Sequence, residues 1–182
     1  IMIMKPAEPV IIEKIGLSYT DLAVAILVCK GLGYVGTSAL WARWLDRLNI
    51  FTFTSLVFFI VGVSYVFLLS GTFITFFVFI CYFVYGIFLA GNHLSWNLSG
   101  TIFCTKGDSS SFTSVSVAMV GLRGLVGPFM GSALLVFFGP FSVLTLGVSL
   151  CVVSGLRMMR WGASAEVKKT SPSLLSFKKS LQ

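Results

Sequence analysis

Charged residues are scarce in this chain: Asp, Glu, Lys and Arg make up 10% of its 182 residues, whereas hydrophobic residues make up 57%. The mean hydropathy is +0.97. So little polar surface could not cover a soluble domain in water. The short segments of alternating polarity that a membrane β-barrel needs are also missing. The sequence therefore predicts an all-α protein with lipid as its solvent, because helices satisfy their own backbone groups.

Groups of catalytic or metal-binding residues are missing too. There is one histidine, carboxylates are not paired at helical spacing, and no glycine-rich loop with a lysine could cradle phosphates. The cysteines lie singly in or beside apolar runs, as packing residues do: Cys29, Cys81, Cys104 and Cys151. We therefore expect neither an enzyme nor a cofactor or metal site.

The net charge of +7 could indicate a nucleic-acid partner. The cations are, however, spread through loops and a tail between the apolar runs, without forming one basic face. Membrane topology explains this distribution better, and we expect membrane lipid and no nucleic acid as a partner.

Five apolar runs are each long enough to cross a bilayer, which takes about 20 helical residues. Gly139-Pro140 separates the last two runs. The pattern predicts a polytopic membrane protein with five transmembrane helices in residues 20–161, an external N-terminal segment, 1–19, and a basic cytoplasmic tail, 162–182. The runs cover approximately residues 21–40, 51–69, 73–103, 113–138 and 141–159.

The cations also predict an orientation. If five spans alternate, nine cations share one side, and only Lys5 and Lys14 lie on the other. Under the positive-inside rule, the N-terminus is then outside and the C-terminus cytoplasmic, in a plasma or inner membrane. The nine are Arg43, Arg47, Lys106, Arg157, Arg160, Lys168, Lys169, Lys178 and Lys179.

Two cations, Lys30 and Arg123, fall inside predicted spans at about midplane depth. A charge there is costly, so it should face a cavity or a partner. The acids Asp21, Asp46 and Asp108 fall at span ends or in loops, and no carboxylate is expected at midplane depth. Both cations are cavity candidates that would attract an anionic group. The structural alternatives are a strut to neighbouring carbonyls for Arg123 and snorkelling to the interface for Lys30.

A polar, aromatic cluster, GNHLSWNLSG, occurs near the end of the third span. His93 and Asn97 share one helical face, and Asn92 and Trp96 share another. The cluster could line a pathway, so we take His93 and Asn97 as further cavity candidates. Residues of this kind also settle at the membrane interface without any chemical role.

The fourth span has a small and bendable face built from Gly124, Gly127, Pro128 and Gly131. The spacing of Gly127 and Gly131 is the small-xxx-small pattern that lets helices approach closely. Packing is the simplest explanation. Bending during alternating access is the functional alternative.

Two stretches resemble the major facilitator superfamily of transporters. GTSALWARWLDRLN, residues 36–49, resembles its short loop between the second and third helices of each half. SVSVAMVGLRGLVGPFMG, residues 114–131, with the preceding WNL, is similar to its tenth and eleventh helices. The resemblance implies a partial major-facilitator-type bundle of helices eight to twelve. It also implies a cytoplasmic gating loop containing Gly36, Arg43, Asp46 and Arg47.

The resemblance implies the C-terminal part of a secondary active transporter for a small solute. The cations weakly suggest that this solute is anionic. Because the family binds its substrate between two halves, we expect a second polypeptide or a missing part of the chain to supply the other helices. The alternatives are a remnant that does not transport and a small scaffold that binds partner helices.

Overall fold

The computed structural model describes residues 2–45, 48–103 and 109–163, without the side chains of 97–103, 109–113, 116 and 162–163. Within these ranges every regular element is helical and no strand occurs. The all-α prediction is therefore confirmed for the described part. The elements are α1 (Ala7–Ile15), α2 (Tyr19–Val24), the π-helix η1 (Ala25–Cys29), α3 (Lys30–Leu45), α4 (Ile50–Ser70), α5 (Phe76–Phe103) and α6 (Ser109–Ala163).

Four helical stretches in the described residues are long and apolar enough to cross a membrane, which is compatible with an integral, multi-pass protein. They are Tyr19–Leu45, Ile50–Ser70, Phe76–Trp96 and Val117–Trp161. The first continues past residue 40, where we had expected the first apolar run to end, because Trp41 turns inward and extends the packed face of α3.

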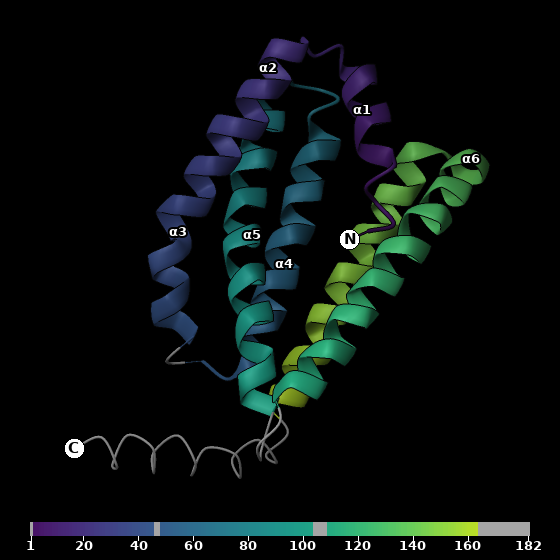
Figure 1. Cartoon of the computed structure of the whole chain (residues 1–182). Helices are drawn as coiled ribbons and strands as arrows, with labels where there is room; N and C mark the ends of the chain where they lie inside the picture. The colour runs from purple at the N-terminus through teal and green to yellow at the C-terminus, as the bar shows by residue number, and fades with distance from the viewer. Residues whose placement is uncertain (1, 46–47, 104–108, 164–182) are drawn as a thin grey trace.

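The fourth stretch contains the predicted break. Gly139 has φ 77° and ψ 167°, a backbone conformation that is accessible almost only to glycine. Pro140 follows and cannot donate a backbone hydrogen bond. The two arms of α6, before and after Gly139, run side by side in Figure 1. A single element thus accounts for two of the five apolar runs.

The helices form an open row in the order α3, α5, α4, α6 (Figure 1). Helix α4 packs on both α5 and α6, while α3 packs mainly on α5. The most apolar window of α4 is accordingly 44% buried, against 11% for the stretch that contains α3. Helix α3 therefore lies at one edge of the row, with most of its surface free for lipid or another protein.

Helices α3 and α5 approach each other closely at two glycines. A Cβ on Gly86 would collide with the backbone carbonyl of Lys30, and a Cβ on Gly33 with that of Phe83. Farther along, the Trp41 indole Nε1 donates a hydrogen bond to the Ile87 carbonyl at 2.8 Å. Small residues thus let the two backbones touch, and the indole fixes their register.

The N-terminal segment packs into the bundle. Met4, Ala7 and Ile11 are fully buried. A Cβ on Gly127 would lie 2.6 Å from the Met2 Cβ, and Gly131 lies against Ile3. Residues 2–15, part of the N-terminal segment 1–19 that we expect to be external, therefore contribute to the core. The apolar stretches in this segment are too short to be recognised as a membrane span, although each of them buries one face against the helices.

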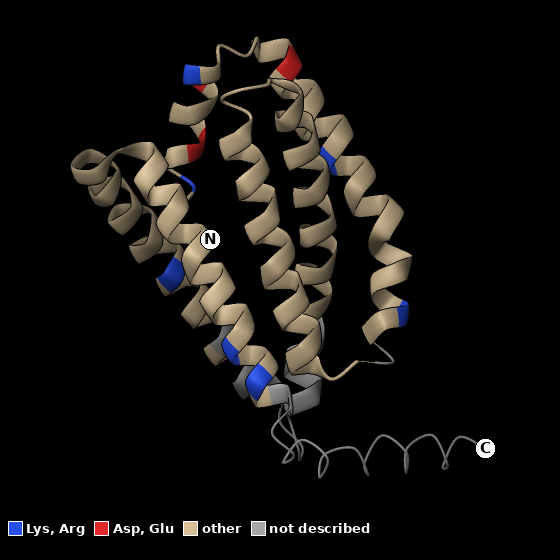
Figure 2. Ribbon diagram, turned by 180° about the vertical axis from the view of Figure 1, so that it is seen from behind, with Lys and Arg blue, Asp and Glu red and all other residues tan. Residues whose placement is uncertain are grey.

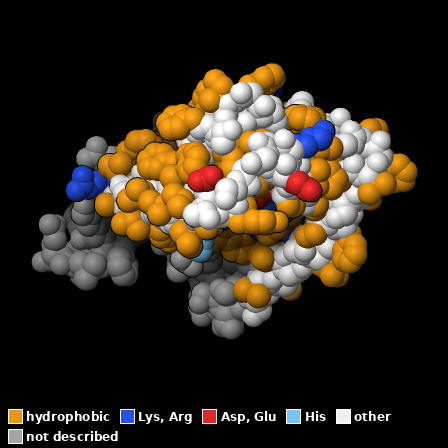
Figure 3. All heavy atoms as spheres, turned by 90° about the horizontal axis from the view of Figure 1, so that it is seen from above, with side chains coloured by type: hydrophobic (Ala, Val, Ile, Leu, Met, Phe, Trp, Pro, Cys, Tyr) orange, Lys and Arg blue, Asp and Glu red, His pale blue; other side chains and the backbone are white. Residues whose placement is uncertain are grey.

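The acids that the structure describes gather at one end of the molecule. The described acids are Glu8, Glu13 and Asp21, which lie at the end formed by α1 and α2 (Figure 2). Arg43 and Arg160 lie in the last turns of α3 and α6, at the opposite end. Seen from the α1 and α2 end, hydrophobic side chains surround the few charged groups (Figure 3). The flanks are thus largely apolar, with Lys30 and Arg123 as cations along the helices between the two ends.

Candidate functional site

Lys30 follows directly after the π-helix η1, at the first residue of α3. A π-helix inserts one extra residue per turn and is frequently found at functional sites. Lys30 is eleven residues beyond Tyr19, or roughly 16 Å along the first apolar stretch. Its side chain is half-buried and makes no hydrogen bond or ion pair with the residues that the structure describes. Lys30 is therefore a cation without a protein partner in that part of the chain.

His93 is exposed on α5, and its ring meets that of Tyr34 on α3, edge to face, with centroids 5.9 Å apart. Tyr34 is one helical turn beyond Lys30, so Lys30 and Tyr34 share a face of α3. The side chain of Asn97 lies outside the described residues. His93 thus lies where α5 faces α3, the helix that carries Lys30. Along α5 it is about two turns beyond Gly86, which approaches the Lys30 carbonyl.

Arg123 lies on the first arm of α6 with an exposed side chain, and its Cζ is 5.3 Å from the centroid of the Trp96 ring on α5. It is fourteen residues, or roughly 21 Å, beyond Ser109, where α6 begins, and sixteen residues before the break at Gly139. Arg123 therefore lies near the middle of the first arm of α6, where it rests on the aromatic ring of Trp96.

The cavity candidates do not form one cluster. Lys30 is on α3 at one edge of the row and Arg123 on α6 at the other (Figure 1). His93 contacts the α3 side of α5, whereas Trp96, three residues later, contacts the α6 side. The described residues therefore provide two separate cationic positions.

The residues predicted for a gating loop divide into two sets. Gly36 and Arg43 are helical, because α3 continues to Leu45, and both are exposed. Asp46 and Arg47 lie outside the described residues. The loop itself is therefore shorter than the resemblance implied.

The glycine face of α6 is only partly open. Gly124 has open space around it, whereas Gly127 and Gly131 receive Met2 and Ile3 of the N-terminal segment. Helical geometry continues through Pro128, since Gly139 is the only residue with non-helical backbone angles within α6. The face thus packs against the chain's own segment, and the bend lies at Gly139 instead.

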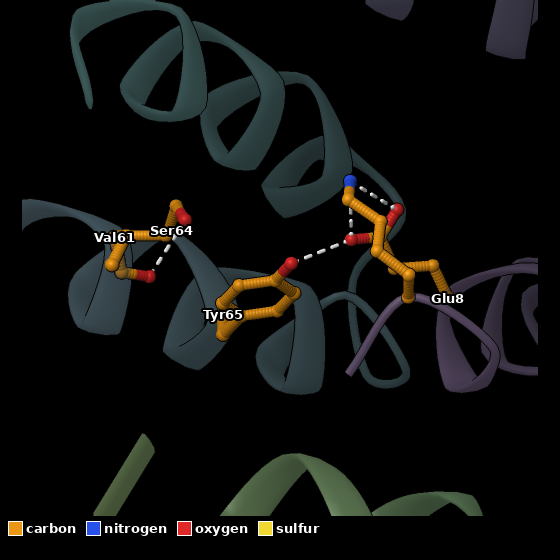
Figure 4. Close-up of polar contacts among 5 residues, drawn as sticks. Glu8, Val61, Ser64 and Tyr65 are labelled. Carbon is orange, nitrogen blue, oxygen red and sulfur yellow. Dashed lines mark hydrogen bonds and ion pairs between the residues drawn. The ribbon is translucent and has the colours of Figure 1, made fainter. Parts of the chain in front are cut away.

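A charged cluster that we had not anticipated lies between the N-terminal segment, α4 and α5. Lys5 Nζ donates to both carboxylate oxygens of Glu8, at 2.9 Å to Oε1 and 3.1 Å to Oε2. The Tyr65 hydroxyl of α4 donates to the same Glu8 Oε1 at 2.6 Å (Figure 4). Glu8 is therefore held from two directions, by a cation of its own segment and by a helix of the bundle.

Tyr85 of α5 completes this cluster. Lys5 Nζ lies 4.6 Å from the centroid of its ring, which is nine residues, or roughly 13 Å, into α5. Burial lowers the pKa of Lys5, but the Glu8 carboxylate and the Tyr85 hydroxyl raise it by more, so the net direction is upward from 10.5.

The sequence did offer a signal for this cluster. Lys5 and Glu8 are three residues apart and are flanked by the apolar runs IMIM and VII, as in a short amphipathic helix that buries a paired charge. A hydropathy average over a window as long as a membrane span hides this short pattern. Tyr65 and Tyr85 give no comparable signal, because tyrosines in apolar helices are common.

The cysteines behave as expected where they are described. Cys29, Cys81 and Cys151 are free, and the last two are buried. Groups of three or more His, Cys, Asp or Glu that could hold a metal do not occur among the described residues.

No protein-family model, characterised protein or solved structure matches this chain. The resemblance to the major facilitator superfamily therefore stays a prediction.

Proposed function

We propose that this chain is the C-terminal part of a secondary active transporter, a major-facilitator-like permease that moves a small solute across a membrane. The observation that carries the proposal is Lys30. It is half-buried and roughly 16 Å along an apolar helix, it directly follows a π-helix, and its side chain has no partner in the described part. Ionisable residues within membrane spans mark solute and ion pathways more often than packing positions.

We propose that the two arms of α6 each cross the membrane, which brings the number of crossings to five. The element Val117–Trp161 has 45 residues, or roughly 68 Å of helix, about twice the hydrocarbon thickness of 30 Å. The break at Gly139 divides this length near its middle. Five crossings with Arg43, Arg157 and Arg160 at the cytoplasmic end place the α1 and α2 end outside, as the positive-inside rule favours.

The solute of this transporter carries an anionic group that pairs with Lys30. The rest of the cavity comes from a second polypeptide, or from a further part of a longer chain. Support for such a neighbour comes from the apolar edge of the row, where Leu27 is 73% and Val35 is 74% exposed on either side of Lys30. A lysine surrounded by lipid alone would be costly, whereas a neighbouring helix bundle would enclose it.

The test is uptake of radiolabelled anionic and neutral solutes into proteoliposomes. The chain alone is compared with the chain co-expressed with any polypeptide, encoded upstream, that supplies further spans. We expect uptake only in the pair, and a loss of at least tenfold for the anionic solute in Lys30→Gln. Lys14→Gln, which removes an exposed cation at the end of α1, is the matched control and should leave uptake unchanged.

Undiminished uptake in the Lys30→Gln variant would remove the assigned role of this lysine. Absence of uptake in every combination would favour a remnant that does not transport. A scaffold that binds helices through Gly127 and Gly131 is not favoured, because Met2 and Ile3 already occupy that face.

A further inference from the structure

The Lys5 ammonium contacts groups of the kind that recognise ammonium ions. Glu8 supplies two acceptor oxygens within 3.1 Å, and Tyr85 supplies an aromatic face 4.6 Å away. A carboxylate combined with an aromatic ring is the usual chemistry of ammonium recognition. The ammonium group of any other primary amine carries the same N–H donors as a lysine, so it could make the same contacts.

The acceptor is fixed independently of the lysine. The Tyr65 hydroxyl holds Glu8 Oε1 at 2.6 Å, and Tyr65 is only 2% exposed on the central helix α4. The neighbouring Met4 and Ala7 are fully buried and anchor the backbone around Glu8. The carboxylate therefore keeps its position when the Lys5 side chain is removed.

The Lys5–Glu8 pair is also partly open to its surroundings. The Lys5 side chain is 38% exposed and that of Glu8 17%. A small amine could enter along the path that the lysine stem now occupies.

We propose that Glu8, Tyr65 and Tyr85 form a binding site for a primary ammonium group, and that Lys5 is its resident occupant. The inference does not depend on the transport proposal. The tethered lysine acts as a competing ligand at an effective concentration of about millimolar or higher. A free amine therefore binds measurably only when Lys5 is shortened or displaced.

The experiment is chemical rescue in the full chain, purified in detergent at pH 7. Lys5→Ala should lower the melting temperature, and n-butylammonium chloride at about 50 mM should restore at least half of that loss through ligand linkage. Three matched controls should give no rescue: n-butanol, which lacks the charge; the Lys5→Ala/Glu8→Gln double variant, which lacks the acceptor; and the unsubstituted chain, whose site is occupied.

Equal shifts in the single variant, the double variant and the unsubstituted chain would overturn the proposal, since they would report a general effect of the salt. A Lys5→Ala chain that is stable and does not respond to the amine would overturn it as well. If Lys5→Ala does not fold alone, it is expressed and purified with butylammonium or butanol throughout. If folded Lys5→Ala is obtained with butylammonium and not with butanol, the result supports the site. If neither additive yields folded protein, the result counts against the site.

Discussion

The hydrogen bond between Tyr65 and Glu8 gives a prediction of defined size. Tyr65→Phe removes one hydroxyl and keeps the ring, so packing on α4 is unchanged while Glu8 Oε1 loses a donor at 2.6 Å. Hydrogen bonds to charged groups contribute about 1.5–3 kcal/mol. Tyr65 is 2% exposed, so water does not replace the lost donor readily.

We therefore expect Tyr65→Phe to lower the free energy of unfolding by about 1.5–3 kcal/mol. For a chain of this length each kcal/mol corresponds to about 2–4 °C, which gives a fall in melting temperature of about 3–12 °C. The assay is thermal unfolding in detergent, followed by circular dichroism. Tyr82→Phe is the control, because the Tyr82 hydroxyl makes no hydrogen bond within the described residues.

A coupling measurement isolates the pair. The loss in Tyr65→Phe should largely disappear when Glu8 is already Gln, since the charge that the hydroxyl stabilises is then absent. If Tyr65→Phe and Tyr82→Phe have equal effects in the chain that retains Glu8, the hydroxyl contributes nothing and the reasoning fails.

Two further predictions concern backbone contact and pH. Gly86→Ala should destabilise the chain by about 1–3 kcal/mol, because its Cβ meets the Lys30 carbonyl, while Gly31→Ala, with open space around it, should be neutral or stabilising in the same melting assay. Because the folded pKa of Lys5 is raised, its stabilising contribution is complete below about pH 10.5 and declines as the pH rises through the higher folded pKa. The difference in melting temperature between the unsubstituted chain and Lys5→Gln should thus hold from pH 7 to 10 and shrink above that; a difference that grows there would contradict the raised pKa.

Much of the architecture follows from hydropathy and turn chemistry. Apolar runs of bilayer length dictate helices, and Gly139-Pro140 marks the break, because glycine adopts positive φ and proline ends a hydrogen-bonded run. We predicted that the first apolar run ends at residue 40, because Trp41 lies within a polar sequence, whereas α3 continues to Leu45. The burial of Trp41 depends on Gly91 and Phe53 of other helices, which no local pattern reveals.

The candidate site was predicted only in part. A cation in the middle of an apolar run is visible in the sequence, so Lys30 could be named as a candidate from the sequence. The contact between Arg123 and Trp96 could not be predicted, because the two residues are distant in sequence and only the packing of α5 beside α6 brings them together. The Glu8 cluster was missed because its members come from three segments, each of which has an ordinary explanation when considered alone.

The order of the helices in the row has a consequence for biosynthesis. Helix α3 is made before α4 but packs chiefly on α5, so its partner emerges only after roughly 60 further residues. At ordinary ribosomal rates of about 5–20 residues per second, this leaves α3 without its helical neighbour for about 3–12 s. During that interval the Gly33 and Gly86 contacts cannot form, and α3 relies on lipid or on the insertion machinery to cover the face that α5 later packs against.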